Sequence, residues 1–279
     1  MKILKPVLFL CVALSFVTAC KKDVDMTLMQ KTVLENTDIR ILVVDDAWQV
    51  TVVADSSTYV ELEYSAYLEP YLKSKLDGVR LEIGFAGNVR PVINSEFRAT
   101  VHTNRIENIE ARDASQLVFS GLFAATSDCL AIHLENASVC TGLTYSGNEY
   151  EVIIEDASQF LGFHLSGTMS EVKVSDASTC KGDFDMSSEL DIIMSGASRL
   201  VTFGGATPYA FIKLQDACLL NMVQTEVNRM SIQLSDASEA TVNVTESMTG
   251  ALIEASTLYY KGHPQLNVEC SDDSQLIPF

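Results

Sequence analysis

Hydrophobic and polar residues alternate with period two through most of the chain after residue 105, in segments rich in Val and Ile. This alternation is typical of β-strands that bury one face. No segment of this half has a convincing helical period. The pattern therefore predicts an all-β fold.

A recurring tripeptide sets the phase of these segments. Ala is its second residue in eight of nine copies, and Ser is its third residue in eight. Successive copies are 23, then five times 20, then twice 18 residues apart. Strand repeats of about 20 residues predict a β-solenoid in which each repeat forms one coil. The first residues of the nine copies are Asp113, Asn136, Asp156, Asp176, Gly196, Asp216, Asp236, Glu254 and Asp272.

The residue types of the tripeptide predict a corner between strands. Asp, Asn and Gly adopt the left-handed backbone conformation at the lowest cost, so we expect the first position to be left-handed. We expect Ala to follow because the inside of a corner has little room, and Ser to bond the turn or form a ladder. An acidic ladder that binds calcium is the alternative, but Asn136 and Gly196 interrupt it and no calcium-binding nonapeptide is present. We therefore predict no metal and no cofactor.

The sequence also predicts β-structure for residues 24–105, but out of register with the later repeat. Alternation predicts strands near residues 39–43, 50–52, 60–64 and 79–83, with one short helical turn within 67–76 that Pro70 interrupts. We expect residues 36–105 to form irregular opening coils and a cap, and residues 106–279 to form the regular coils.

The first 20 residues have the pattern of a signal peptide. Lys2 and Lys5 precede an apolar run of residues 7–17, which is too short to span a bilayer. The run ends in Val17-Thr18-Ala19-Cys20, which resembles the lipobox of bacterial lipoproteins. The resemblance implies cleavage after residue 19, lipidation of Cys20 and a tether over residues 20–35. An ordinary secretory signal with an incidental cysteine is the alternative.

Several of these features together resemble the head GIN domain family of auto-transporter adhesins, which are envelope lipoproteins of Gram-negative bacteria. The features are the strands near residues 39–64, the Asp77-Gly78 turn before strand 79–83, and the repeated Asp/Gly-Ala-Ser corners. The resemblance covers residues 36–279. It implies a right-handed parallel β-helix, lipid-anchored to the outer membrane at its periplasmic face or at the cell surface.

Charge and motifs exclude several functions. The net charge of −18 disfavours nucleic-acid binding and adhesion to anionic membranes through a basic patch. Parallel β-helices also include polysaccharide-degrading enzymes, so we searched for carboxylates beside a cation. The best constellation is Asp183 and Asp185 with Lys181 and Arg199. A solvated strand face is the simpler interpretation.

Histidines, cysteines and aromatic residues add little chemistry. The histidines occupy different phases of the repeat, so we expect surface positions and no cluster. Cys140 and Cys180 share one phase but lie two coils apart, about 9.6 Å, which is too far for a disulfide. Exposed aromatic residues could stack on sugar rings, and we expect Phe160 to lie in the core. The histidines are His102, His133, His164 and His263, and the aromatic candidates are Tyr145, Tyr150, Phe163, Tyr209, Tyr259 and Tyr260.

The sequence thus favours a non-enzymatic, lipid-anchored envelope protein that adheres or binds through its sheet faces or its tip. A glycan or an envelope protein is the expected partner, besides the membrane itself. A β-helix enzyme acting on acidic polysaccharide and a purely structural module are the alternatives. The sequence does not indicate the oligomeric state.

Overall fold

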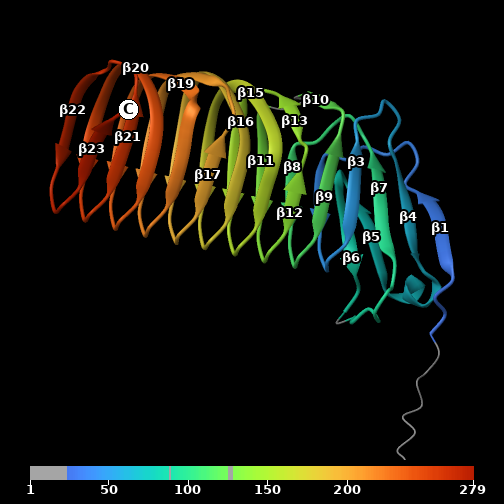
Figure 1. The fold of residues 1–279 in the computed structure, drawn as a ribbon. Helices are drawn as coiled ribbons and strands as arrows, with labels where there is room; N and C mark the ends of the chain where they lie inside the picture. The colour runs from blue at the N-terminus through green and yellow to red at the C-terminus, as the bar shows by residue number, and fades with distance from the viewer. Residues whose placement is uncertain (1–23, 88, 125–127) are drawn as a thin grey trace, which may run out of the picture.

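The chain forms a β-solenoid in which successive coils stack into a rod (Figure 1). The structure is a computed structural model and describes residues 24–87, 89–124 and 128–279. The predicted signal peptide and Cys20 lie outside these residues. Within the described ranges, no helix is both long and apolar enough to cross a membrane.

Each coil enters a corner on one strand and leaves it on another. Entering strands are β2 (Ile41–Val44), β8 (Asn108–Ala111), β11 (Cys129–Leu134), β14 (Glu149–Ile154), β18 (Ala206–Leu214) and β22 (Gln265–Cys270). Leaving strands are β3 (Gln49–Val53), β9 (Gln116–Ser120), β12 (Val139–Thr141), β17 (Arg199–Thr202), β21 (Thr257–Lys261) and β23 (Gln275–Pro278).

Further strands complete the circuit of the coils. Two short ones, β10 (Leu122–Ala124) and β13 (Thr144–Ser146), form a third side together with the middle of β15. Long bent strands run from one corner to the next, namely β15 (Gln159–Val174), β16 (Thr179–Met194), β19 (Leu219–Leu234) and β20 (Glu239–Leu252). Pairing between coils is parallel throughout this part, as the predicted solenoid requires.

The tripeptides form left-handed corners. All nine first positions have φ between 52° and 63°, and the second positions are left-handed too, with φ between 57° and 61°. Two successive left-handed residues make a type I′ turn. The N–H of each corner Ala donates to the carbonyl of the first corner residue one coil further on, at 2.7–2.9 Å. The expectation for Ala is wrong in one respect, because these side chains are exposed on the outside of the turn.

The corner Ser points inward and forms a ladder. The Ser138 N–H donates to Ser158 Oγ at 3.1 Å, and the Ser158 N–H donates to Ser178 Oγ at 3.2 Å. Ser138 Oγ in turn donates to the Glu135 carbonyl at 2.7 Å, so Ser138 bonds the turn through its hydroxyl and the next coil through its N–H. Serine therefore satisfies buried backbone groups that an apolar residue would leave without partners.

Hydrophobic rows run along the inside of the rod. Residues two and four positions before the corner and four positions after it are buried in nearly every coil, and Phe160 is completely buried. Cys140 pairs with Phe160 and Phe160 pairs with Cys180. The predicted two-coil separation of the cysteines is confirmed.

The opening segment contains a corner that the sequence interpretation missed. Asp46 and Ala47 have φ of 61° and 59°, and the Ala47 N–H donates to the Asp113 carbonyl at 2.9 Å. The strand β2 pairs in parallel with β8, and β3 pairs in parallel with β9. The expectation that residues 36–105 lie out of register is therefore wrong for this coil. Trp48 takes the serine position, and Asp113 lies 67 residues after Asp46.

The rest of the opening segment caps the rod. It comprises β1 (Leu28–Val33), β4 (Tyr59–Ser65), the 3₁₀ helix η1 (Ala66–Tyr71), β5 (Leu72–Asp77), β6 (Arg80–Phe85) and β7 (Phe97–His102). The predicted strands and helical turn are confirmed. Strand β4 pairs antiparallel with both β1 and β7, and Trp48, Phe85 and Phe97 pack with ring centroids 5.4–5.9 Å apart. The tether over residues 20–35 is wrong in its second half, because β1 covers the open edge of β4.

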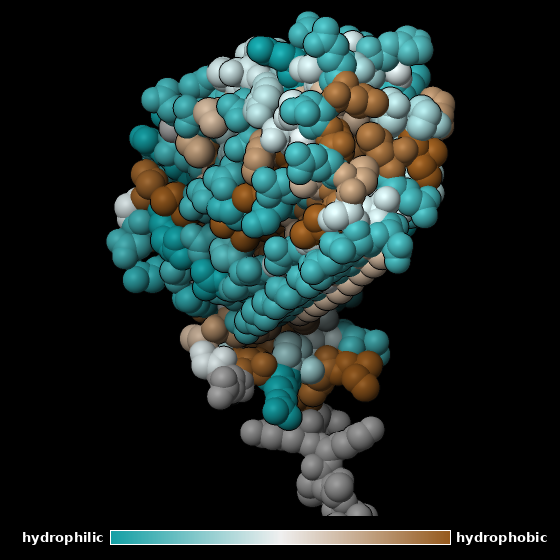
Figure 2. All heavy atoms as spheres, turned by 90° about the vertical axis from the view of Figure 1, so that its left-hand side faces the viewer, coloured by the Kyte–Doolittle hydropathy of each residue, from teal (hydrophilic) through white to brown (hydrophobic). Residues whose placement is uncertain are grey.

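The other end of the rod has no such cap among the described residues. Figure 2 looks onto this end and shows separate hydrophobic patches within a mostly hydrophilic surface. Leu266 of β22 is 44% exposed, and Phe279, which follows β23, is 63% exposed. Cys270 of β22 is exposed at this end of the rod.

The corner geometry predicts a clear difference between two substitutions at Asp176, where φ is 54°. Asp176→Gly should be nearly neutral, whereas Asp176→Val should destabilise the fold by about 1–2 kcal/mol, since a branched residue resists the left-handed region. Thermal unfolding of both variants measures this. Gln159→Val, on an exposed strand position, is the control, and equal melting temperatures for the two Asp176 variants would contradict the assignment.

Candidate functional site

The predicted acid–base constellation is not assembled in the structure. Asp183 Oδ1 accepts a hydrogen bond from the Phe203 N–H at 2.9 Å. Arg199 lies beside Thr179 rather than beside Lys181. Among the described residues, neither aspartate forms an ion pair with Lys181 or Arg199. The geometry gives no support to a polysaccharide-cleaving site here.

The aromatic candidates for sugar stacking divide into two groups. Tyr145, Tyr150 and Phe163 are buried, at 1%, 3% and 2% exposure, so their expected role as surface platforms is wrong. The large rings fill the rod where a coil bends, as Phe160 and Phe163 do when they stack at 4.1 Å. Tyr209, Tyr259 and Tyr260 are half-buried.

A polar groove lies over the capped end of the rod. It has a volume of about 500 Å³ and crosses β1, β4, β7, β3 and β9. The sequence interpretation missed it, because antiparallel pairing of β1, β4 and β7 brings together segments that share no repeat. Pairing registers order its outward residues into two rows, Gln30–Glu63–Arg98–Gln49–Gln116 and Thr32–Glu61–Thr100–Thr51–Val118.

The groove side chains are held by contacts with one another. Gln30 Nε2 donates to Glu63 Oε2 at 2.9 Å, and an Arg98 guanidinium nitrogen lies 2.5 Å from Glu63 Oε1. The same nitrogen lies 3.3 Å from Glu96 Oε2. The amide, carboxylate and guanidinium groups are therefore oriented before any ligand arrives.

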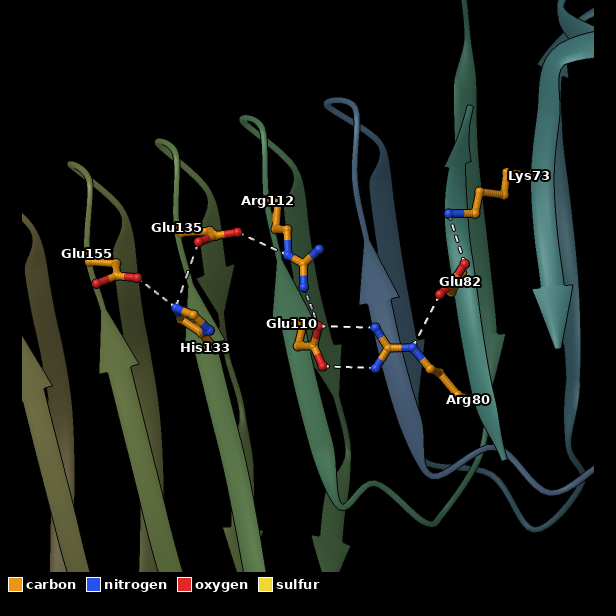
Figure 3. Close-up of polar contacts among 8 residues, drawn as sticks. All are labelled: Lys73, Arg80, Glu82, Glu110, Arg112, His133, Glu135 and Glu155. Atoms are coloured by element: carbon orange, nitrogen blue, oxygen red, sulfur yellow. Dashed lines mark hydrogen bonds and ion pairs between the residues drawn. The ribbon is translucent and has the colours of Figure 1, made fainter. Parts of the chain in front are cut away.

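A ladder of charged side chains crosses the strands on another side of the rod (Figure 3). We call it the charged ladder; its members are Lys73, Glu82, Arg80, Glu110, Arg112, Glu135, His133 and Glu155. Glu110 accepts from Arg80 at 3.0 and 3.2 Å and from Arg112 at 2.6 Å. The Lys73 and Arg80 side chains hold the pKa of the Glu82 carboxyl below its usual range.

The histidines lie apart from each other, but two of them contact carboxylates. His133 Nε2 is 2.9 Å from Glu155 Oε1 in the charged ladder. His102 is mostly buried, with Nδ1 3.3 Å from Asp55 Oδ2 and its ring stacked on Tyr59 at 4.0 Å. The surface position expected for His102 is therefore wrong, because the cap covers it.

On the same face of the rod, three carboxylates follow one another on successive coils, with Lys173 Nζ 2.8 Å from the middle one. Glu151, Glu171 and Asp191 stand opposite one another on successive coils. Burial raises the pKa of Asp191 to about 6, and the carboxylates of Glu189 and Glu171 add to this rise. Like charges stacked at the coil spacing of about 4.8 Å oppose folding when ionised.

Comparisons with known proteins relate the chain to a family of putative adhesins and to solved structures of similar fold. A family model described as "Putative auto-transporter adhesin, head GIN domain" matches residues 40–264. A putative adhesin from Parabacteroides merdae has a similar structure, with a TM-score of 0.67, 13% identity, and coverage of 92% of this chain and 98% of that chain. No curated protein matches the sequence.

Two structures from Parabacteroides distasonis are also similar. A putative adhesin gives a TM-score of 0.65 at 14% identity and covers 91% of this chain and 98% of that one. A putative lipid binding protein gives a TM-score of 0.61 at 10% identity and covers 90% of this chain and 96% of that one. At these identities the likeness shows the fold alone.

The acidic row predicts a pH-dependent effect of Asp191→Asn. The folded pKa of about 6 exceeds the unfolded value of about 3.9, so ionised Asp191 destabilises the fold above pH 6, and this penalty disappears as the pH falls to 4. Asp191→Asn should therefore raise stability by about 1 kcal/mol at pH 7.5 and leave it unchanged at pH 4. Thermal melts at both pH values measure this, with Asp185→Asn as the control. An equal effect of Asp191→Asn at both pH values would exclude the electrostatic cause.

Proposed function

Because the chain belongs to the putative auto-transporter adhesin, head GIN domain family, we propose that it is a non-enzymatic, lipid-anchored binding protein of the bacterial outer membrane that holds neutral glycans in its polar groove. The observation that carries this proposal is the groove of about 500 Å³ and its two rows of polar side chains. Adhesion to a glycan-bearing surface is the function that this groove supports best.

The lining of the groove suits hydroxyl-rich ligands. Amides, hydroxyls, carboxylates and a guanidinium offer donors and acceptors side by side, as the hydroxyls of sugars require. The rows cross five strands, which span about 19 Å at the strand spacing. This length accommodates a short oligosaccharide. An acyl chain fits poorly, because the outward rows contain one apolar residue, Val118.

The affinity of one groove for a glycan should be modest, and the presence of many anchored copies on one surface should compensate for it. The groove lining contains no aromatic residue that could stack on a sugar ring. Hydrogen bonds that replace bonds to water contribute about 0.5–1.5 kcal/mol each. Many anchored copies facing a polyvalent glycan gain avidity without any new contact.

The fold also supports anchoring at the capped end. The Ala66 N–H donates to the Thr27 carbonyl at 2.8 Å, and the Tyr67 N–H donates to the Asp25 carbonyl at 3.1 Å. Only residues 21–24 then separate Cys20 from the fold. At about 3.5 Å per residue, this short tether keeps the capped end close to the membrane.

Glycan binding is tested with the chain lacking its first 20 residues on an array of neutral and acidic glycans. Wild type should retain neutral oligosaccharides, and the Glu63→Ala, Arg98→Ala double variant should lose at least tenfold in binding. The matched control is Glu171→Ala, Lys173→Ala, which removes an exposed ion pair of 2.8 Å outside the groove. Unchanged binding of the groove variant, or no glycan binding by the wild type, would overturn the proposal.

Anchoring is tested by metabolic labelling of the full chain with a fatty-acid probe. Wild type and Cys11→Ala should carry the label, whereas Cys20→Ala should carry none, because the lipidated thiol is then absent. Cys11 lies in the leader and serves as the control. A labelled Cys20→Ala protein would show that the anchor is wrongly assigned.

A further inference from the structure

Three side chains at the end of the charged ladder converge on one point. His133, Glu135 and Glu155 each offer a ligand atom, and these atoms all lie within 4.8 Å of one another (Figure 3). His133 Nε2 is 2.9 Å from Glu155 Oε1 and 4.0 Å from Glu135 Oε2. Each side chain is 25–37% exposed, so an ion could reach the cluster from solvent.

The solenoid register brings the three residues together. His133 and Glu135 are two positions apart on one coil and so project from the same face. Glu155 occupies the equivalent of Glu135 on the next coil, where its N–H donates to the Leu134 carbonyl at 2.9 Å. Glu135 and Glu155 directly follow β11 and β14, so the parallel register of these two strands sets their backbone spacing.

A contact outside the cluster orients one carboxylate. Arg112 Nε lies 3.0 Å from Glu135 Oε1, which leaves Oε2 as the oxygen that faces His133. Arg112 is itself held by Glu110 at 2.6 Å. Such supporting contacts fix ligand direction in metal sites.

The end of the ladder places an imidazole, rather than a lysine or an arginine, between two carboxylates. From Lys73 to Glu135, cations and carboxylates alternate. The imidazole of His133 then stands between two carboxylates, Glu135 and Glu155. A divalent cation held by all three groups would continue the alternation in a chain whose net charge is −18.

We propose that His133, Glu135 and Glu155 bind one divalent transition-metal ion of the zinc type. One imidazole nitrogen with two carboxylate oxygens is a ligand set suited to zinc, whereas calcium and magnesium take oxygen ligands. Tetrahedral bonds of about 2.0–2.1 Å place ligand atoms about 3.4 Å apart, so small side-chain rotations complete the site. Water takes the fourth position.

Zinc binding is measured by isothermal titration calorimetry and by equilibrium dialysis on the chain lacking its first 20 residues. Wild type should bind one zinc ion per chain, and zinc should raise its melting temperature. His133→Ala and Glu155→Gln should each weaken binding at least tenfold. Arg112→Gln should weaken it by a smaller factor, because the carboxylate loses its orientation.

The control is His263→Ala, which removes an exposed histidine in the turn before β22 and should leave zinc binding unchanged. Millimolar magnesium should not displace the zinc. The circular dichroism spectra of His133→Ala and Glu155→Gln should match that of the wild type, which separates loss of the site from loss of the fold. Absence of stoichiometric zinc binding in the wild type, or wild-type affinity in both cluster variants, would overturn the proposal.

Discussion

The two-residue left-handed corner is the constraint on which the rest of the structure depends. Every coil must return to it with the same phase, because the corner Ala N–H bonds the corner of the next coil. In several coils the serine N–H also bonds the serine hydroxyl of the next coil. A slip of one residue would turn the buried rows outward, since strand side chains alternate between faces. The 23- and 18-residue steps leave the entering strands and corners in phase and change length elsewhere in the coil.

The same register creates the outer surface. Outward residues of successive coils align about 4.8 Å apart, so residues about 20 positions apart in sequence become neighbours. The charged ladder and the acidic row at Asp191 both arise in this way. His133 and Glu155 could have been related from the repeat phase alone, since Glu155 follows Glu135 by one coil. That all three side chains turn toward one point could not be predicted from the sequence and is seen only in the structure.

The sequence predicts the repetitive part of the fold better than the cap. The buried rows and the left-handed corners follow directly from the tripeptide and its flanks. The corner at Asp46 was not predicted from the sequence, because a capping insertion separates it from Asp113 and Trp48 replaces the serine. Strand β1 was not predicted because its residues, LMQKTV, do not alternate between hydrophobic and polar types. As an edge strand it also stays largely exposed. Because β1 forms one side of the groove, the groove could not be predicted from the sequence either.

The charges in the groove favour a neutral ligand over an acidic one. Arg98 lies between Glu63 and Glu96, at 2.5 and 3.3 Å, so two carboxylates already engage its charge. Glu61 lies in the second outward row of the groove and adds a further carboxylate. An acidic polysaccharide would therefore meet little uncompensated positive charge there, and the net charge of −18 would repel it from a distance. A neutral glycan meets neither penalty, because its hydroxyls can both donate to the carboxylates and accept from the amides.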